Sequence, residues 1–574
     1  MQDLREHELL ELAAQHEESF VWQSADISAQ AMAAALAPLR KTKDPKTYAA
    51  ALKDPRAPKW LEATETEWNG LWDKGCFESV PSAGKQTMRL MWVYKLKSDG
   101  RYKARLVVDG RQQDPSTYGS IASPTMKLTS MRILLALAAK NQWQIYADDA
   151  HMAFLNAMRP PDKPVYAQFP DGYRDGSHGK CLLLRRCLYG LHDSPQHWYD
   201  EMRKFVVDEY GLTPSKVDAC YFNSKNKDLH VVVHVDDFLI TGTETSVARF
   251  RKALYAKFDM DGGEAREYFG LHIDNDKNNG VVSLDCKASI EPAFSKLGLK
   301  PHAWSTPMSH VEKLPRLEGE CKDKKLQKRY RSLVGCAMHP AVTCRPDVAA
   351  TVRSLSAHLQ HPGQKHLAAA VRCMQYLYHT REKKLVFDSR GCSSSLDASL
   401  YGTCDAAHMA THDAKGITGW AFMLLHAAIS WKCRTQKLTA LSSTEAELIA
   451  IDDAVRELRH LHSLLDEFGV LNTRPTLIAQ DNMSTIALIK SKFWNARTKH
   501  VSLRYHHVGE QARRGVVHVA HLPTAEMTAD VLTKPLPHDA HDRHAAVLLG
   551  HTRLGWLDTV AQEPAHKKRK VEDV

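Results

Sequence analysis

The clearest pattern in the chain is a pair of apolar runs separated by two acidic residues, within Leu229–Gly242. Runs of this length that are rich in β-branched residues predict buried strands, and the break between them predicts a hairpin with Asp236 and Asp237 at its tip. Adjacent carboxylates repel each other, and binding of a divalent cation relieves that repulsion. Taken alone, however, the segment is more simply explained as a solvated acidic turn.

A second pattern is the helix predicted after Ser442, in which apolar residues recur at helical spacing. Glu447 is in phase with this apolar stripe, whereas Glu445 lies with the polar positions and could close a capping box with Ser442. An anionic side chain that faces a core is costly unless it is paired or metal-bound. The pattern therefore favours Glu447 as a ligand. The stripe consists of Ile451, Ala454, Leu458, Leu461 and Leu465.

The remaining patterns predict a multidomain protein of the α+β or α/β class. Short helices and strands alternate from about residue 46 to 245, a mostly helical, basic segment follows to about 390, and a second α/β unit spans about 396–540. Residues 1 to about 45 predict an alanine-rich helix and a basic linker. A further acidic pair, Asp148-Asp149, ends a strand-like run and precedes a predicted helix.

Composition narrows the classes of partner. The 574 residues are enough for several domains. No apolar run approaches the ~20 residues that cross a bilayer, so no membrane partner is expected. The 12 cysteines form no Cys-x-x-Cys pair, which argues against structural zinc and against a disulfide framework. The net charge of +10 is compatible with a polyanionic partner such as nucleic acid.

Many short motifs follow one another in order between residues 46 and 540. They are Lys46-Thr-Tyr-Ala-Ala-Ala-Leu52, Trp92-Val-Tyr-Lys-Leu-Lys97, Arg101-Tyr-Lys-Ala-Arg-Leu-Val107, Ala153-Phe-Leu-Asn156, Leu188-Tyr-Gly-Leu191 with Trp198-Tyr199, Val235-Asp-Asp237, Tyr330-Arg-Ser-Leu-Val-Gly335, Arg345-Pro-Asp347, Leu441-Ser-Ser-Thr-Glu-Ala-Glu447 and Thr533-Lys-Pro-Leu-Pro537. Together they resemble the reverse transcriptase–RNase H region of the Pol polyprotein of copia-type long-terminal-repeat retrotransposons.

The resemblance implies a right-hand polymerase with fingers, palm and thumb, followed by a helical connection and an RNase H-like domain. The implied division is an N-terminal extension (1–45), fingers and palm (46–245), a thumb-like region (246–310), a connection (311–394), an RNase H domain (395–540) and a C-terminal tail (541–574).

The resemblance also implies two catalytic sites, each with two Mg²⁺ ions, for which Mn²⁺ is a potential substitute. In the polymerase the metal ligands would be Asp149, Asp236 and Asp237, while Asp148 has no assigned role. In the RNase H domain the ligands would be Asp405, Glu447, Asp481 and Asp530. Basic side chains between the last two carboxylates are candidates for contacting hybrid phosphates, or form a solvated loop: Arg497, Lys499, His500, Arg504, His506 and His507.

Four residues are candidates for binding the incoming nucleotide. Phe154 would exclude a 2′-hydroxyl, or is simply a core aromatic. Lys103 and Arg105 would contact the triphosphate, or lie on a solvated strand face. Gly190 would let its loop approach the template and nascent base pair. The chain departs from the family pattern at His151, His234 and Leu191-His192-Asp193.

The resulting hypothesis is an enzyme that copies RNA or DNA templates into DNA and hydrolyses RNA in RNA–DNA hybrids. The alternative is a decayed or domesticated nucleic-acid-binding protein without polymerase activity. Expected partners are an RNA template, a DNA primer–template, the hybrid and dNTPs, with integrase or a second copy of the chain as candidates. Lys567–Val571 resembles a nuclear-import signal. It predicts an import receptor as a partner and a location in the nucleus as well as in cytoplasmic virus-like particles.

Overall fold

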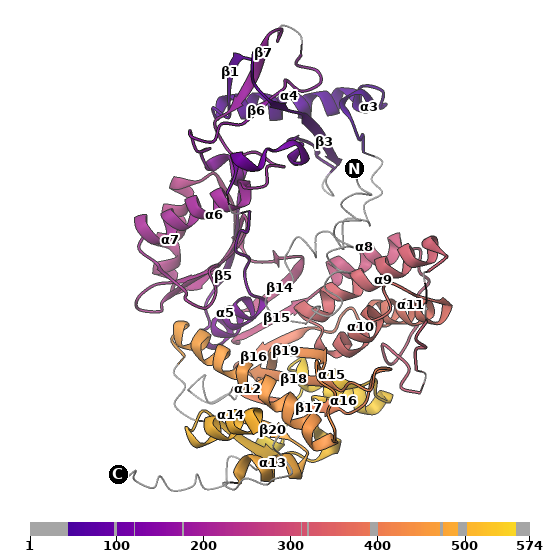
Figure 1. Cartoon of the computed structure of the whole chain (residues 1–574). Coiled ribbons are helices and arrows are strands. Elements are labelled where there is room, and N and C mark those ends of the chain that lie inside the picture. Colours follow the sequence, from indigo (N-terminus) through magenta and orange to yellow (C-terminus); the bar gives the residue numbers. More distant parts are fainter. Residues whose placement is uncertain are drawn as a thin grey trace.

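The structure is a computed structural model that describes residues 44–96, 100–119, 121–174, 177–311, 313–317, 319, 321–390, 400–470, 475–491 and 502–557, without the side chains of 502–505. The predicted N-terminal helix, the basic segment Lys567–Val571 and the basic positions Arg497, Lys499 and His500 lie outside these residues. Helices and strands mix in several packed units (Figure 1), so the predicted multidomain α/β class is confirmed.

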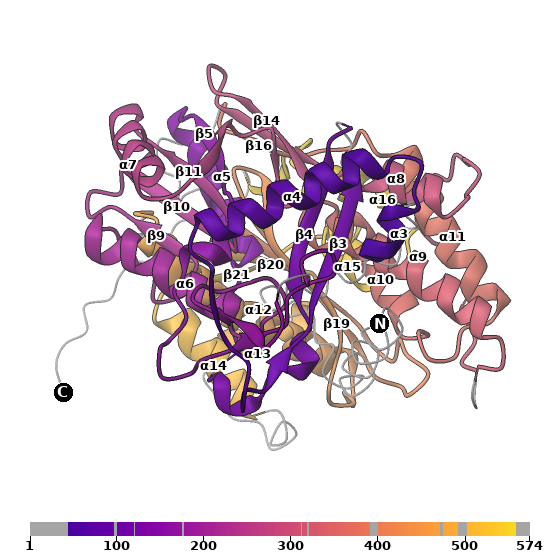
Figure 2. The same cartoon turned by 90° about the horizontal axis from the view of Figure 1, so that it is seen from above.

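The N-terminal unit consists of two small sheets crossed by the long helix α4. One sheet has the strand order β1-β7-β6-β2, and β3 pairs separately with β4. Figure 2 shows α4 lying across β3 and β4, and its Trp60 and Trp68 are buried there with Trp92 and Leu106. The elements are α3 (Tyr48–Leu52), α4 (Ala57–Asp73), β1 (Phe77–Pro81), β2 (Thr87–Met88), β3 (Leu90–Leu96), β4 (Tyr102–Val108), η2 (Gly110–Gln112), η3 (Pro115–Thr117), β6 (Tyr166–Ala167) and β7 (Lys180–Leu184).

The six-stranded sheet that follows, here called the central sheet, has the order β12-β5-β11-β10-β9-β8 and is antiparallel throughout. Its strands are β5 (Ile145–Ala150), β8 (Thr213–Pro214), β9 (Tyr221–Asn223), β10 (Leu229–His234), β11 (Asp237–Gly242) and β12 (Met260–Glu264). The adjoining helices are α5 (Leu128–Asn141), η4 (Ala153–Asn156), α6 (Ser194–Lys204), η5 (Phe205–Glu209) and α7 (Glu244–Lys257).

Both faces of the central sheet are covered, which explains the unbroken apolar runs in its sequence. Val231 and Val233 of β10 pack with α6 and α7 on one face. Val232, between them, and Leu239 of β11 pack with α5 on the other face. Because successive side chains of a strand point to opposite faces, a strand buried on both sides is apolar at every position.

A middle unit joins the central sheet to the C-terminal unit. A four-stranded sheet of order β13-β14-β15-β16 lies beside a group of helices (Figure 1). The strands are β13 (Glu267–Tyr268), β14 (Leu271–Asp276), β15 (Val281–Asp285) and β16 (Leu385–Asp388). The helices are α8 (Lys287–Lys296), α9 (Lys324–Thr343), η6 (Pro346–Val348), α10 (Ala349–Ser356) and α11 (Gln364–His379).

The C-terminal unit is a five-stranded sheet of order β19-β18-β17-β20-β21, in which β20 and β21 run parallel to β17. Its strands are β17 (Tyr401–Ala407), β18 (Ile417–Leu424), β19 (Ala427–Thr435), β20 (Thr476–Gln480) and β21 (Val517–His521). Its helices are α12 (Ser443–Glu467), α13 (Met483–Lys490), α14 (Ser502–Arg513), η9 (Thr524–Glu526), α15 (Asp530–Thr533) and α16 (His538–Leu548). Among the described helices, none combines the length and apolarity needed to cross a bilayer.

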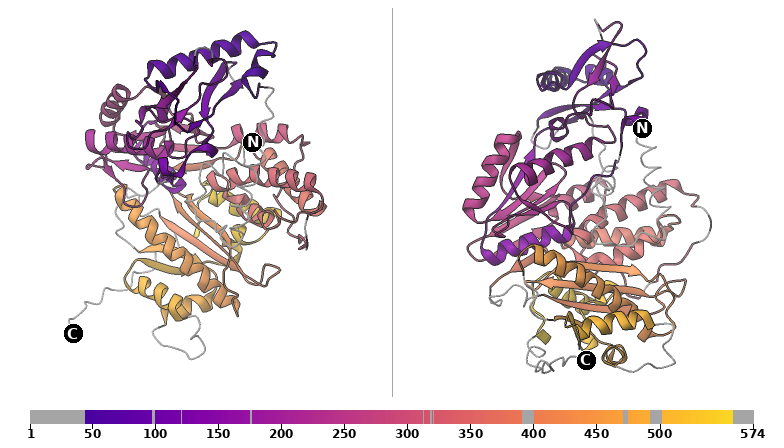
Figure 3. Two further views of the ribbon diagram at one scale, coloured as in Figure 1. Left: turned by 45° about the horizontal axis from the view of Figure 1, so that its top comes forward. Right: turned by 60° about the vertical axis from the view of Figure 1, so that its left-hand side comes forward.

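The C-terminal unit is docked against the rest of the protein, and the two views of Figure 3 show it below the central sheet. Arg132 of α5 is completely buried at this junction. Its guanidinium donates to the carbonyls of Thr343 and Val342 in α9 and of Ile429 in β19, and it lies 3.8 Å from the ring centroid of Trp431. One side chain thus ties together three units, and burial lowers its pKa to about 9.

Several predicted domain boundaries fall inside packed elements. The predicted palm ends at residue 245, yet β12, from the predicted thumb-like segment, pairs with β5. The pair β15–β16 crosses the boundary placed between 310 and 311. The predicted tail begins within α16, whose Val547 and Leu548 are buried in the core of the C-terminal unit, as is Trp556 beyond it. Apolar residues on α16 and after it therefore extend this unit at least to residue 557.

Candidate active sites

The hairpin predicted around the first acidic pair is formed by β10 and β11. His234 is the register partner of Asp237, which leaves Val235 and Asp236 as a two-residue turn. Val235 has a φ of 58°, in the left-handed region that β-branched residues rarely occupy. The carbonyl oxygen of Asp236 accepts a hydrogen bond of 2.9 Å from the backbone N–H of Ala150, so the tip of the hairpin is attached to β5.

The pairing of β11 with β5 brings in the third predicted carboxylate. Asp237 is the register partner of Asp149, so both lie at the same end of the central sheet. One carboxylate oxygen from each of Asp149, Asp236 and Asp237 lies within 4.8 Å of the other two. Three anionic oxygen ligands at this spacing suit a hard divalent cation, as the chemistry of magnesium and calcium sites requires.

The electrostatics of this cluster favour a cation as well. Burial, reinforced by the carboxylates of Asp236 and Asp149, raises the pKa of Asp237 to about 7. Burial and the charge of Asp149 likewise raise the pKa of Asp236, and partial burial raises that of Asp149. The three groups therefore resist carrying three negative charges together, and a bound divalent ion would relieve that cost.

Asp148, next to the first carboxylate, has a different environment. Its side chain is fully buried and accepts hydrogen bonds of 2.7 and 2.8 Å from the guanidinium of Arg251 in α7. The hydroxyl of Tyr255 donates to it as well. Because successive side chains of β5 alternate between faces, Asp148 points to the helical layer while Asp149 points to the cluster. An ion pair thus accounts for Asp148 without a metal.

Two of the four predicted nucleotide-binding residues meet around Tyr189. The guanidinium of Arg105, on β4, lies 4.9 Å from the centroid of the Tyr189 ring, and the ring of Phe154, in η4, lies 5.2 Å from it. The charges of Lys103 and Arg105 act on the carboxyl groups of both Asp149 and Asp236 and oppose the rise in their pKa. Phe154 is half-buried and Arg105 exposed, so both surfaces are accessible.

Gly190 allows a close approach, but the observed neighbour is protein backbone. Its φ is 96°, and a Cβ on it would lie 2.1 Å from the carbonyl oxygen of Val108 at the end of β4. The N–H of Val108 donates to the carbonyl of Tyr189 over 2.8 Å. Glycine is therefore required here to seat the Leu188–Leu191 loop on β4, and a contact of this loop with template stays a prediction.

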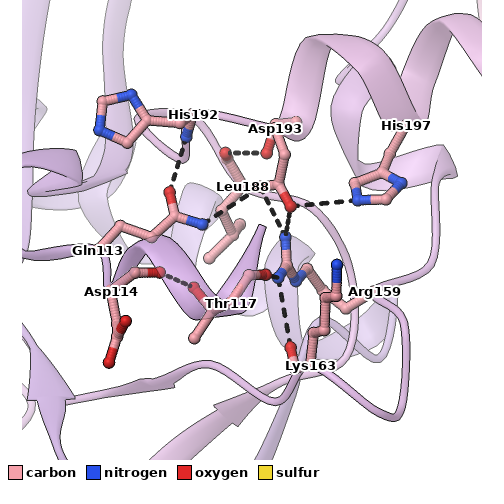
Figure 4. A network of polar contacts seen from close by, with 10 residues as sticks. Gln113, Asp114, Thr117, Arg159, Lys163, Leu188, His192, Asp193 and His197 are labelled. Carbon is pink, nitrogen blue, oxygen red and sulfur yellow. Dashed lines mark hydrogen bonds and ion pairs between the residues drawn. The ribbon is translucent and has the colours of Figure 1, made fainter. Parts of the chain in front are cut away.

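The chain differs from the family pattern at Asp193, and Figure 4 shows the structural reason. Asp193 is buried and receives two hydrogen bonds of 2.7 Å from Arg159, with further contacts to His197 and Gln113. Although burial opposes the charge, the hydrogen bonds from His197 and Arg159 hold the pKa of Asp193 well below its usual range. This ion pair anchors the end of the loop at the start of α6. His192 contributes its backbone N–H, which donates to Gln113.

The other two positions that differ from the family pattern, His234 and His151, also fit the structure. His234 packs edge-on against Phe269 at a centroid distance of 4.8 Å, and burial lowers its pKa to about 4. It is therefore a neutral ring beside the hairpin turn. His151 is exposed, and its Nδ1 lies 3.6 Å from a carboxylate oxygen of Asp259. Neither substitution changes a carboxylate of the cluster.

The second cluster forms in the C-terminal unit. Asp405 lies within β17, Asp481 follows β20 directly, and Glu447 lies in the second turn of α12. One carboxylate oxygen from each of the three lies within 4.8 Å of the others. Asp405 and Glu447 are buried, as the phase of Glu447 with the apolar stripe predicted.

Glu445, the rejected alternative, caps the helix instead. Its N–H donates to the hydroxyl of Ser442 over 3.1 Å, and its carboxylate accepts from the N–H of Leu441 over 2.7 Å. The predicted cap is thus present, although the carboxylate reaches one residue further back than in a capping box. Burial, together with Asp405 and Asp481, raises the pKa of Glu447 well above its usual range.

Asp530, the fourth predicted carboxylate, opens α15 beside Asp405. Burial and the charge of Asp405 raise its pKa to about 7, and its Oδ1 lies 3.0 Å from the ammonium of Lys534. Thr533 donates a hydrogen bond of 2.5 Å to Asp405. Although burial opposes it, the carboxylates of Asp405 and Asp530 raise the pKa of Lys534. The ammonium of Lys534 therefore already compensates part of the negative charge of Asp530.

The basic residues expected to track the hybrid are described only in part. The Nδ1 of His507 on α14 lies 2.8 Å from a carboxylate oxygen of Asp452 on α12, which accepts its hydrogen bond, so His507 lies in a contact between helices. The phosphate-contacting role of the set is a prediction that the described residues leave open.

Three contacting residues were not anticipated from the sequence. Arg251 pairs with Asp148, Lys534 pairs with Asp530, and Trp198 donates from its indole to the carbonyl of Val235 over 2.6 Å. Lys534 follows Asp530 by one helical turn, a spacing that could have indicated the pair. The other two contacts join residues remote in the chain and have no local signal.

One family model covers the residues of the first cluster. Residues 77–308 match the family described as reverse transcriptase (RNA-dependent DNA polymerase), a range that contains Asp149, Asp236 and Asp237. A solved foamy viral protease–reverse transcriptase in complex with double-stranded DNA gives a TM-score of 0.47 at 13% identity, covering 89% of this chain and 82% of that chain.

Longer alignments connect the chain with retrotransposon polyproteins. The Retrovirus-related Pol polyprotein from transposon TNT 1-94 of Nicotiana tabacum is 32% identical over 86% of this chain and 38% of that polyprotein. That from transposon RE1 of Arabidopsis thaliana is 32% identical over 89% and 35%, respectively. The chain thus spans a little over a third of the length of these relatives. The chain carries a reverse transcriptase domain, and over most of its length it is similar to the copia-type retrotransposon Pol polyproteins.

Proposed function

We propose that the chain is a reverse transcriptase with an associated ribonuclease H, each activity served by its own two-metal carboxylate centre. The N-terminal unit and central sheet would be the fingers and palm, residues 246–310 would include the thumb, α9–α11 would form the connection, and the C-terminal unit would be RNase H-like. The observation that carries the proposal is that two separate carboxylate triads, remote in the chain, each converge to within 4.8 Å.

The donor sets suit divalent cations, and Mg²⁺ is the ion we propose, with Mn²⁺ as a substitute. In the polymerase centre Asp149, Asp236 and Asp237 would hold the ions. In the nuclease centre Asp405, Glu447 and Asp481 would hold them, with Asp530 adjacent. At both centres the bound ions would activate an oxygen nucleophile and neutralise charge on the departing group.

The protein side chains would position the substrates around these centres. Lys103 and Arg105 present positive charge towards Asp149 and Asp236, where the triphosphate of a dNTP would lie. Phe154 would close the pocket against the sugar and disfavour a 2′-hydroxyl. In the nuclease centre Lys534 would oppose the rise in the pKa of Asp530 that burial and Asp405 cause. An RNA template, a DNA primer and an RNA–DNA hybrid are the polymeric substrates that this arrangement would serve.

The direct test is RNA-templated primer extension and hybrid cleavage by the purified chain. With Mg²⁺ and dNTPs we expect labelled primer to be extended, the RNA strand of a hybrid to be cut, and both reactions to stop in chelator. A protein that binds primer–template tightly but neither extends nor cleaves would instead support the alternative of a non-catalytic, domesticated element.

For location we propose nuclear entry through Lys567–Val571, together with a cytoplasmic particle stage. Clusters of Lys and Arg of this kind are read by import receptors. A fluorescent fusion of the full chain should accumulate in nuclei, and replacing the lysines and arginine of the segment by alanine should abolish that accumulation. Equal nuclear signal from both fusions would contradict the proposal. Binding of integrase or of a second copy can be measured on the same purified chain.

A further inference from the structure

The hairpin turn that presents Asp236 is held by a residue from another element. The indole Nε1 of Trp198, on α6, donates a hydrogen bond of 2.6 Å to the carbonyl oxygen of Val235. Trp198 is only 1% exposed. The two carbonyls of the turn are therefore both engaged, that of Val235 by Trp198 and that of Asp236 by the N–H of Ala150.

The turn needs such support because of the residue it contains. Val235 has a φ of 58°, and a Cβ-branched side chain is sterically unfavourable in this region. Two-residue hairpin turns favour glycine or asparagine at positions of positive φ. A valine here persists only if neighbouring contacts over-determine the backbone. The direction of the Asp236 side chain follows from that backbone, because Asp236 is the next residue.

Trp198 is itself placed rigidly. Its ring packs edge-on against Phe258 at a centroid distance of 5.2 Å, at the end of α7. Its helix begins at Ser194, directly after Asp193, and Asp193 is fixed by its ion pair with Arg159. The indole N–H is thus held in position by buried contacts on both sides.

We propose that Trp198 is a positioning residue for the polymerase centre: its indole N–H holds the strained Val235 turn so that Asp236 meets Asp149 and Asp237. This inference rests on the proposed two-metal function of that cluster. Without the hydrogen bond, Val235 would relax towards negative φ and the carboxylate of Asp236 would leave the geometry needed for a shared cation. Trp198 touches neither substrate nor metal in this role.

The test compares Trp198→Phe with a matched control, Trp92→Phe. Trp92 is also a buried tryptophan whose indole donates to a backbone carbonyl, that of Asp171 at 3.0 Å, but in the N-terminal unit. Primer extension is measured over a range of Mg²⁺ and dNTP concentrations. For Trp198→Phe we expect kcat to fall about tenfold. The Mg²⁺ midpoint should rise several-fold, and the dNTP KM should stay within about twofold. Hybrid cleavage by the same preparation should be unchanged.

A second variant separates the turn from general packing. Val235→Gly removes the steric cost of positive φ, so Trp198→Phe/Val235→Gly should recover kcat to within about threefold of the wild-type chain. A Trp198→Phe protein that matches Trp92→Phe in kcat and Mg²⁺ midpoint would overturn the proposal, as would a double variant no better than Trp198→Phe. A wild-type chain that extends no primer would instead contradict the proposed function itself.

Discussion

The two carboxylate clusters differ in how they are built and in how deeply they lie. The first uses a hairpin tip and one neighbouring strand, and Asp149 within it is exposed. The second draws Asp405 and Glu447 from a strand and a helix and buries both. The first site lies at the ends of paired inner strands of the sheet, and its geometry depends on a strained turn. A buried site has its ligands fixed by the core around it.

Charge compensation differs in the same way. In the first cluster, Lys103 and Arg105 act on the carboxylates only through their charge. The pKa of Asp237 is raised to about 7. The second has Lys534 in direct contact with Asp530 and Thr533 bonded to Asp405. Protein groups therefore share the negative charge more directly in the second cluster, although the pKa values of Glu447 and Asp530 are raised there as well.

The largest expected effect comes from removing one ligand at a time. Asp236→Asn should lower primer extension by about a thousandfold and leave hybrid cleavage intact, and Glu447→Gln should do the reverse, because each carboxylate serves one centre. Both activities are measured on each purified variant. If each substitution abolished both activities, the assignment of two independent sites would be wrong.

The junction between the central sheet and the C-terminal unit depends on Arg132, so replacing this residue should destabilise the protein. Arg132→Met keeps the length of the side chain but leaves the carbonyls of Thr343, Val342 and Ile429 without a donor. We expect the free energy of unfolding to fall by about 3 kcal/mol, more than a hundredfold in the folding equilibrium. Denaturant unfolding measures it. Arg456→Met, which removes an exposed guanidinium paired with Asp452 on one helix, is the control and should change stability by less than about 1 kcal/mol.

Discrimination between deoxyribonucleotides and ribonucleotides should depend on the first cluster alone. Phe154→Ala should open the space beside Tyr189 and reduce discrimination against ribonucleotides by about 30-fold or more. The ratio of kcat/KM for a dNTP and the matching rNTP measures it. Hybrid cleavage should be unaffected. Unchanged discrimination would remove the proposed role of Phe154 and leave it as a core aromatic.

The smallest effect concerns pH and the metal-free protein. Because the pKa of Asp237 is raised in the folded state, the folded protein binds more protons than the unfolded chain between about pH 4 and 7, and stability falls as the pH rises through that range. In chelator at pH 8, Asp237→Asn should therefore be more stable than the wild-type chain by about 1 kcal/mol. The difference should shrink towards pH 5. Thermal unfolding in chelator at both pH values tests it, and a constant difference would contradict the charge-repulsion argument.

Part of the architecture could be predicted from local sequence. The apolar runs around Asp236 predicted the hairpin, because β-branched runs on both sides of a short break favour paired strands. Its turn lies one residue earlier than the predicted tip: Val235 and Asp236 form it, and Asp237 already belongs to β11. The helical phase of Glu447 with Ile451 and its neighbours indicated burial, because periodicity records which face of a helix packs on the core. The order of motifs then indicated which remote carboxylates to group together.

The rest was decided by tertiary structure. Asp148 and Asp149 are adjacent and chemically identical, and only the location of Arg251 and β11 separates an ion pair from a candidate ligand. Gly190 was expected to approach nucleic acid, whereas its observed neighbour is the backbone of Val108. The hydrogen bond from Trp198 to Val235 and the buried contacts of Arg132 join elements far apart in the chain. Local patterns encode which face of an element is buried, but the partner on that face is chosen by packing between elements.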